Sequence, residues 1–413
     1  TCGVGSFSFG SGNAAQLVRL PLHLLGSLAT RLIPRSPRRW VFGCAIGVGE
    51  GALALWRHAD AAGHRTVWLV ASDREAADAA ALGIRPVPKA TLRGFWETAR
   101  ARVVVVTHGA GDVNRYATAG AFLVQLWHGI PLKRIGLDSP VTARAPRGIP
   151  GLGRFLTFAY RRTQSRIRLL PAASHLVRGR LESAFGLADS RVPVTGEPRT
   201  DVLLVGEPAA RRERARALIE DVVGDLGERP VVLYAPTWRD GEADSGVPTA
   251  GEWAGILAAL ERADAVLLIR SHPLGAGDYT PPGGTDRVRS LGADLLAEAT
   301  PILPGIDLLV TDYSSLVFDT ALIPVPVVFF APDEADYSRT RGFYGAYRDV
   351  ATDVATQWED VCAQIVTVLT DAAEAERRRD RARALSARVH AFRDGRSAER
   401  VYGAIVAANG GKP

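Results

Sequence analysis

Short runs of consecutive apolar residues recur along the chain, and segments with helical patterns separate them. The run Ala101–Thr107 (ARVVVVT) shows no polar alternation, which is typical of a strand buried on both faces of a parallel sheet. Similar strands are predicted at Trp40–Ala45, Thr66–Ala71 and Ala121–Leu126, with a helix over residues 51–62 after the first. This alternation of strand and helix predicts a layered α/β domain.

The same alternation begins again in the second half of the chain. Four further apolar runs are predicted to be strands: Pro230–Tyr234, Ala265–Ile269, Asp307–Thr311 and Pro326–Phe330. Helical patterns lie between them, such as Glu252–Arg262. The sequence therefore predicts two doubly wound domains, with the active site in a cleft between them and at the carboxyl ends of the strands.

The expected domain organisation follows from these patterns. It comprises an amphipathic basic N-terminal segment (1–37), an N-terminal Rossmann-like domain (38–200), a C-terminal Rossmann-like domain (201–370) and a helical tail (371–413). Within the first segment, residues 14–33 are mostly apolar but interrupted by Arg19, Pro21, His23 and Arg31. This stretch fits either a helix on a membrane surface or a helix packed on the protein.

Composition excludes several classes of protein. Hydrophobic residues make up 47% and charged residues 23% of the 413 residues, which excludes a disordered or fibrous chain. Three widely spaced cysteines exclude a cysteine-rich zinc module and a disulfide framework. No uninterrupted apolar run of about 18 residues and no ordered secretory signal is visible, so no spanning helix is expected.

Positive charge is concentrated in one stretch. Residues 141–180 contain nine arginines and no acidic residue, so the rest of a chain with net charge +6 carries −3. Residues 1–49 also lack acidic residues. Such patches attract nucleic acid, acidic lipid headgroups or a polyanionic substrate. Within residues 151–170, arginines alternate with apolar side chains, which suits anionic lipids or a polyphosphate chain; a solvated basic face is the alternative.

Two histidines follow predicted strands. His128 comes after Ala121–Leu126, between a tryptophan and a Gly-Ile-Pro turn, and His272 comes after Ala265–Ile269. Histidine is the side chain best suited to accept a proton near neutral pH. Each can also be a structural histidine that supports a loop, but their positions at strand ends favour catalysis.

Hydroxyl and guanidinium groups follow two other strands. Thr237 and Arg239 come after Pro230–Tyr234, and a guanidinium suits phosphate oxygens. Ser314 and Ser315 precede a predicted helix, whose free N–H groups favour anions. An Arg–Asp surface pair and simple N-capping are the respective alternatives. Asp319, one turn further on, either reaches a ribose hydroxyl or is solvated.

No Walker A sequence, H-E-x-x-H or G-x-S-x-G motif is present, so no cofactor and no protein-held metal is predicted. A metal held mainly by the substrate stays open. The side chains of Arg239, His272, Ser314 and Ser315 all suit binding to phosphate. We therefore expect the protein to stabilise the phosphate groups by its own hydrogen bonds and charges.

Several stretches together resemble the CDP-glycerol glycerophosphotransferase family, the teichoic acid primases and polymerases. The matching segments are WHGIPLKRIGLD (127–138), VTGEPRTD (194–201), YAPTWRD (234–240), RSHP (270–273), TDYSSLVFDTALIPVPVVFF (311–330), RGFY (341–344) and FRDGRSAERV (392–401). Each motif alone is weak, but their order and spacing from about residue 38 to the C-terminus are specific. Ile130 and Glu197 depart from the residues usual in the family, and the second departure bears on the choice of alditol or acceptor.

The resemblance implies a GT-B-type fold of two Rossmann-like domains and a peripheral protein on the cytoplasmic face of the membrane. It implies transfer of glycerol phosphate, or ribitol phosphate, from a CDP-alditol to a hydroxyl of a lipid-linked or polyanionic acceptor, with release of CMP. His128 is then the general base. His272 is the second residue expected to act in catalysis, by holding the pyrophosphate together with Arg239, Ser314 and Ser315. The other groups expected to bind the substrate are Thr237, Arg270, Asp319 and Lys133.

Two other functions compete with this interpretation. A GT-B glycosyltransferase would share the sheets but use a nucleotide sugar, and it would release UDP or GDP. A basic scaffold for membrane or nucleic acid would explain residues 141–180 but not the residues at the strand ends, and no nucleic-acid-binding signature is found. Nucleic acid is therefore not an expected partner, an anionic membrane surface is, and a homo-oligomer is left open.

Overall fold

The computed structural model describes residues 20–140, 152–237, 239, 244–271 and 277–410. The chain forms two compact units. Unit 1 comprises Thr1–His128, Arg134–Asp201 and Asp394–Pro413, and unit 2 comprises Gly129–Lys133 and Val202–Arg393. Within the described ranges, no helix is both long and apolar enough to cross a membrane.

Unit 1 is built on six parallel strands. The strands are β1 Ser36–Phe42, β2 Arg65–Val70, β3 Pro86–Pro88, β4 Ala101–Val106, β5 Phe122–Gln125 and β6 Ile167–Leu169. The helices are α2 Leu20–Leu32, α3 Glu50–Ala61, α4 Asp73–Ala81, α5 Leu92–Arg100, α6 Leu152–Gln164, α7 His175–Phe185 and α14 Ser397–Ala408. The strand order β3-β2-β1-β4-β5-β6 is that of a doubly wound dinucleotide-binding sheet.

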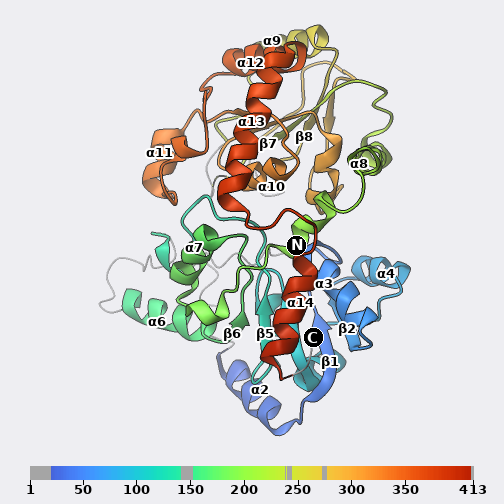
Figure 1. The fold of residues 1–413 in the computed structure, drawn as a ribbon, viewed down its shortest axis with the longest axis vertical. Helices are drawn as coiled ribbons and strands as arrows, with labels where there is room; N and C mark the ends of the chain where they lie inside the picture. The colour runs from blue at the N-terminus through green and yellow to red at the C-terminus, as the bar shows by residue number, and fades with distance from the viewer. Residues whose placement is uncertain (1–19, 141–151, 238, 240–243, 272–276, 411–413) are drawn as a thin grey trace. The chain divides into compact units, whose positions relative to one another are not determined.

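The core of unit 1 joins segments from both ends of the sequence. Val103 and Val105 of β4 pack in one buried cluster with Leu55 of α3 and with Val401 and Ile405 of α14. Figure 1 shows the red helix α14 beside the blue helix α3. The C-terminal helix therefore completes a face of the N-terminal sheet.

Unit 2 is built on five parallel strands. They are β7 Val231–Ala235, β8 Val266–Ile269, β9 Val288–Ser290, β10 Leu308–Thr311 and β11 Val327–Phe329. The helices are α8 Pro208–Val223, α9 Ala250–Arg262, α10 Leu316–Leu322, α11 Glu334–Thr340, α12 Trp358–Thr370 and α13 Ala372–Val389. The order is β11-β10-β7-β8-β9, so in this sheet the strand order reverses between β7 and β10.

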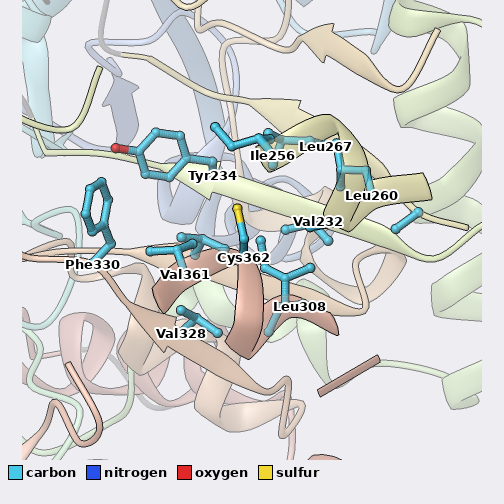
Figure 2. Packing of buried hydrophobic residues seen from close by; sticks show 14 of the residues in the cluster. Val232, Tyr234, Ile256, Leu260, Leu267, Leu308, Val328, Phe330, Val361 and Cys362 are labelled. Atoms are coloured by element: carbon cyan, nitrogen blue, oxygen red, sulfur yellow. The ribbon is translucent and has the colours of Figure 1, made fainter. Parts of the chain in front are cut away.

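Both faces of the second sheet are buried, and β7 shows why its sequence is continuously apolar. Val232 and Tyr234 face a cluster that includes residues of α9 and α12, as Figure 2 shows. Val231 and Leu233 belong to a separate cluster that includes Ile219 of α8. Successive side chains of a strand point to opposite faces, so a strand covered on both sides needs apolar residues at every position.

The structure confirms every strand predicted from an apolar run, with boundaries that differ by a few residues at most. In the part of the chain that the structure describes, three strands were not predicted: β3, β6 and β9, of three residues each. All three lie at sheet edges, where one side needs no partner and a short or polar strand suffices.

The C-terminal end of the chain differs from the predicted tail. Residues 372–408 form two helices, α13 and α14, and not one separate segment. Helix α13 belongs to unit 2, where it packs against α10 and α12, whereas α14 belongs to unit 1. Helix α13 thus packs on helices of unit 2 and α14 packs on α3 of unit 1, which a composition pattern cannot reveal.

Candidate active site

Polar side chains of unit 1 gather where its central strands end. Cys44 follows β1, Thr107 and His108 follow β4, and His128 follows β5. The strand order reverses between β1 and β4, which is where doubly wound sheets bind their ligands. The predicted base His128 therefore lies at the edge of the sheet where a ligand is expected. Its side chain is half-buried.

A buried carboxylate holds the turn after β4. Asp112 Oδ2 accepts hydrogen bonds from the backbone N–H groups of Thr107 (2.9 Å), His108 (2.8 Å) and Gly109 (3.3 Å). The Thr107 hydroxyl lies 3.0 Å from Nδ1 of His108. These bonds fix both the backbone and the ring of His108.

The imidazole of His108 stacks on that of His128. The ring centroids are 4.0 Å apart and the planes are inclined by only 3°. Burial lowers the pKa of His108, although Asp112 acts in the opposite direction. A neutral His108 ring can therefore orient His128 without opposing its protonation by a like charge.

The residue before His128 adopts an unusual backbone conformation. Trp127 has φ of 64°, in the left-handed region that non-glycine residues rarely occupy. Such a conformation costs about 1–3 kcal/mol and persists only where the surroundings impose it. The Trp127 ring lies 4.0 Å from that of His128 and meets Phe185 edge-on at 5.0 Å, so packing on both sides holds this turn.

Two of the motifs in unit 1 contact each other. Gly196 has φ of 80°, and a Cβ there would lie 2.3 Å from the Ser397 hydroxyl. Asp201 accepts hydrogen bonds from the backbone N–H of Ser397 (2.9 Å) and of the next residue (2.7 Å). Glu197 and Arg199 are both buried, and Oε2 of Glu197 lies 3.7 Å from Nη2 of Arg199. The segment VTGEPRTD therefore anchors the start of α14.

In unit 2, Asp312 joins the two central strands at their carboxyl ends. It follows β10, and its Oδ1 accepts hydrogen bonds from the backbone N–H of Thr237 after β7 (2.9 Å) and from that of Tyr313 (2.5 Å). The Asp312 side chain is almost fully buried. The strand order reverses between β7 and β10, so this carboxylate marks the second expected ligand-binding edge.

The guanidinium of Arg239 is committed to protein acceptors. Nε and Nη2 donate to the two oxygens of Asp333 at 2.7 and 2.9 Å, and Nη1 donates to Asp312 at 2.9 Å and to the Thr237 carbonyl. Four of its five N–H groups are used in this way. Arg239 is therefore placed to organise this region rather than to offer a free fork to phosphate.

Charges in this cluster are strongly coupled. Burial by itself would lower the pKa of Arg239, but Asp333 and Asp312 raise it above its usual range. Burial raises the pKa of Asp312 in spite of Arg239, whereas hydrogen bonds from Arg239 leave the pKa of Asp333 lowered despite its partial burial. The cluster keeps Arg239 charged at any physiological pH.

Aromatic rings surround the cluster and reach Lys133. Tyr313 and Tyr337 stack at 4.0 Å, and the Arg239 guanidinium lies about 5 Å from both ring centroids. The Lys133 ammonium is 5.9 Å from the Tyr337 ring. Burial lowers the pKa of Lys133 to about 8; Asp312 raises it, and Arg341 and Arg239 lower it further.

Hydroxyl groups predicted to bind the substrate lie near the same strand ends. Thr237 Oγ1 is buried and has no hydrogen-bond partner among the residues that the structure describes. Ser314 accepts a hydrogen bond from the backbone N–H of Leu316 at 3.3 Å, and Ser315 precedes α10 without capping it through its side chain. These groups keep donor capacity for a ligand.

Two other residues that were predicted to bind the substrate, Arg270 and Asp319, are buried or bonded within the protein. Arg270 donates to the backbone carbonyls of Leu291, Leu296 and Ala297, and burial lowers its pKa to about 10. Asp319 is fully buried, so the solvated alternative is wrong. His272 lies outside the described residues. Within them, no group of three or more His, Cys, Asp or Glu could hold a metal ion.

Several residues of these sites were not predicted from the sequence, among them His108, Asp112, Asp312 and Asp333. His108 follows a strand just as His128 does, so the same argument could have found it. Asp112 and Asp333 could not be found by that argument, because each acts through hydrogen bonds that only the folded chain brings about.

Comparison with known proteins decides the family. A family model described as CDP-glycerol:poly(glycerophosphate) glycerophosphotransferase matches residues 50–407. The chain belongs to this family. The match includes all the motifs named above and the strands from β2 to β11, but not β1, and it confirms the resemblance found in the sequence.

Relatives and solved structures agree with this assignment. The chain is 29% identical over 233 residues to the teichoic acid poly(glycerol phosphate) polymerase of Staphylococcus epidermidis, which covers 55% of this chain and 31% of that protein. It is 27% identical over 274 residues to a teichoic acid glycerol-phosphate transferase of Staphylococcus aureus, covering 63% and 65%. The chain thus spans about a third of the length of the first of these relatives and slightly less than two thirds of the second.

Among solved structures, the wall teichoic acid polymerase TagF aligns with a TM-score of 0.76 at 19% identity, covering 96% of this chain and 95% of that chain. A TagF variant soaked with CDPG aligns with a TM-score of 0.74. At this identity the likeness shows the fold, and it confirms the predicted GT-B-type class of the family member described here.

Proposed function

We propose that this protein transfers glycerol phosphate, or a related alditol phosphate, from a CDP-alditol to a hydroxyl of a lipid-linked or polymeric acceptor in the synthesis of a cell-envelope polymer. The match of the glycerophosphotransferase family over residues 50–407 carries this proposal. The imidazole of His128 at a strand end supplies the base that such a transfer needs.

The reaction is a displacement at phosphorus. The acceptor oxygen attacks the phosphorus that bears the alditol and forms a new P–O bond, while the bond to the bridging oxygen breaks. CMP leaves with that oxygen and its electron pair, and His128 takes the proton of the acceptor hydroxyl. A general base of this kind contributes about 10²–10⁴-fold. The remaining acceleration comes from positioning and from charge stabilisation.

We assign the pyrophosphate to groups of unit 2. Thr237 Oγ1 has hydrogen-bonding capacity to spare, and Ser314 and Ser315 add hydroxyl groups beside the same strand end. The Lys133 ammonium supplies positive charge. Arg239 is a positioning residue in this scheme, because Asp312 and Asp333 occupy most of its donors. His272 keeps its proposed role in holding the pyrophosphate.

We further propose that the protein works at the cytoplasmic face of the membrane as a peripheral protein. Its basic charge is concentrated in residues 141–180, and α2 and α6 carry exposed apolar side chains next to arginines. A lipid-linked acceptor would be presented at that surface.

A donor screen tests the proposed activity. The protein is incubated with CDP-glycerol, CDP-ribitol, UDP-glucose or GDP-mannose, each with a lipid-linked acceptor, and the released nucleotide and the product mass are followed. Release of CMP with a mass gain of one alditol phosphate is expected. Release of UDP or GDP with a gain of one sugar would show a glycosyltransferase and contradict the proposal.

A further inference from the structure

A pocket rich in arginine opens in unit 1 between α2 and the end of α6. It has a volume of about 220 Å³. Four guanidinium-bearing side chains line it together with Ser27, Ser165 and residues 118–121; they are Arg31, Arg162, Arg166 and Arg168. Four like charges around one small cavity repel each other, and a bound anion would offset this repulsion.

The pocket has no counter-charge of its own. Among the described residues, no acceptor is hydrogen-bonded to these four guanidinium groups, whereas Arg178 on the neighbouring helix α7 pairs with Glu182 and Asp189. Residues 1–49 and 139–181 contain no Asp or Glu, so the surrounding chain brings no carboxylate. Burial lowers the pKa of Arg166, and the charges of Arg162 and Arg31 lower it further.

Two backbone carbonyls at the pocket wall, those of Thr118 and Ala119, already accept hydrogen bonds. Arg35 donates to the carbonyls of Ala117 and Ala119 and thereby supports the loop that lines the cavity. On the other wall, α2 approaches that loop closely at Gly26, where a Cβ would lie 2.7 Å from the Tyr116 carbonyl. The walls are therefore fixed by their own contacts, and the four arginines remain for an external anion.

The size of the pocket limits its ligand. Pockets for drug-sized ligands enclose about 300–1,000 Å³. The arginine pocket is smaller, which suits a phosphate group with a short substituent rather than a whole CDP-alditol. Arginine binds phosphate oxygens through two parallel N–H bonds, so several arginines around one cavity are the expected arrangement for a phosphate ester.

Apolar side chains flank the pocket. On α6, Phe155 and Phe158 are 56% and 66% exposed and share a side of the helix with Arg162, at 100° per residue. On α2, Leu25, Leu28 and Leu32 form one exposed side next to that of Arg31. A phosphate pocket bordered by two exposed apolar helix faces matches an amphiphile with an anionic head.

We propose that this pocket binds the phosphodiester of a glycerophospholipid headgroup, with the flanking phenylalanine and leucine side chains entering the apolar layer of the membrane. The choice of a lipid as the occupant rests on the proposed function at the membrane. A phosphodiester of a soluble glycerol-phosphate polymer has the same chemistry without the apolar part, and the test distinguishes the two.

The test compares two double variants with the same loss of charge on the same segment. Arg162→Gln/Arg166→Gln removes two pocket arginines, and Arg154→Gln/Arg161→Gln removes two exposed arginines of α6 that do not line the pocket. Binding is measured by co-sedimentation with vesicles of phosphatidylcholine alone or mixed with phosphatidylglycerol. Because a charge-assisted hydrogen bond contributes about tenfold or more, the pocket variant should lose at least about tenfold more affinity for the anionic vesicles than the control.

Equal losses in both variants would show diffuse surface attraction and overturn the pocket. Calorimetry with soluble ligands separates the sources. Glycerophosphoglycerol should bind the wild type and not the pocket variant. Inorganic phosphate binding as tightly as this diester would show a simple anion site and overturn the lipid assignment. Loss of poly(glycerol phosphate) binding with unchanged vesicle binding would assign the pocket to the polymer. Vesicle binding needs no turnover, so it is decided independently of CMP release, which is measured on the same variants.

Discussion

Replacement of Arg239 tests whether this residue organises unit 2 or holds the donor phosphates. Arg239→Gln removes the charge that compensates Asp312, which is only 3% exposed. Removal of one partner of a buried ion pair typically costs about 3–5 kcal/mol because the other charge is left uncompensated. For a unit of this size, that cost corresponds to a fall in Tm of about 6–20 °C.

The double variant Arg239→Gln/Asp312→Asn removes both charges, so about 1–3 kcal/mol of the loss should return. Arg212→Gln is the matched control, since Arg212 pairs with Asp307 but is 44% exposed. Exposed pairs contribute about 0–1 kcal/mol, and the control should leave Tm nearly unchanged. Differential scanning calorimetry measures all three variants.

Donor affinity provides the second readout. If Arg239 acts only through Asp312 and Asp333, calorimetric affinity for CDP-glycerol should change by less than about tenfold at a temperature where the variant is folded. A direct contact with phosphate would contribute about 1.5–3 kcal/mol, or about 10–150-fold. An unchanged Tm combined with such a loss of affinity would refute the structural interpretation.

Three further predictions concern single residues. Gly196→Ala should lower Tm, because the new Cβ would meet Ser397 and the φ of this residue is 80°. Gly179→Ala within α7 should raise Tm slightly, because a Cβ there meets nothing within 4 Å; the reverse order of the two Tm values would contradict this. The kcat/KM for CDP-glycerol should fall as pH rises through about 8, because Lys133 loses its proton there. Lys133→Arg should abolish this fall; an unchanged pH profile in the variant would exclude Lys133 as its cause. His108→Ala should lower kcat, and His108→Phe, which keeps a stacked ring, should restore most of it; failure of that rescue would exclude a stacking role.

Desolvation fixes the sign of the Lys133 effect. The folded-state pKa of about 8 lies below the ordinary value of 10.5, so folding favours the neutral amine. The charged amine therefore weakens the folded state below pH 8, and this penalty disappears as pH rises from about 8 towards 10.5. Lys133→Met should accordingly stabilise the protein at pH 7, which urea unfolding can measure.

The central strands could be predicted from the sequence because burial on both faces demands nearly continuous apolar residues, as in β7 and, apart from the exposed Arg102, in β4. The short edge strands could not, because β3 reads only PVP and β9 only VRS. Their pairing depends on neighbouring strands rather than on their own composition.

The position of His128 could also be predicted, since parallel strands bring their carboxyl ends to one edge of the sheet. The role of Arg239 could not, because its partner Asp333 lies 94 residues away in the sequence. The sequence shows an arginine after a strand, but it does not show whether a phosphate or a protein carboxylate accepts the hydrogen bonds of its guanidinium. The buried partner decides between the two, and only the fold supplies it.

The most direct test of the proposed transfer compares His128→Ala with the wild type. CMP release from CDP-glycerol in the presence of a lipid-linked acceptor is measured together with CDP-glycerol affinity by calorimetry. Loss of the base should lower turnover by about 10²–10⁴-fold while donor affinity is largely retained. Transfer at a near wild-type rate by His128→Ala would contradict the assignment of His128 as the general base.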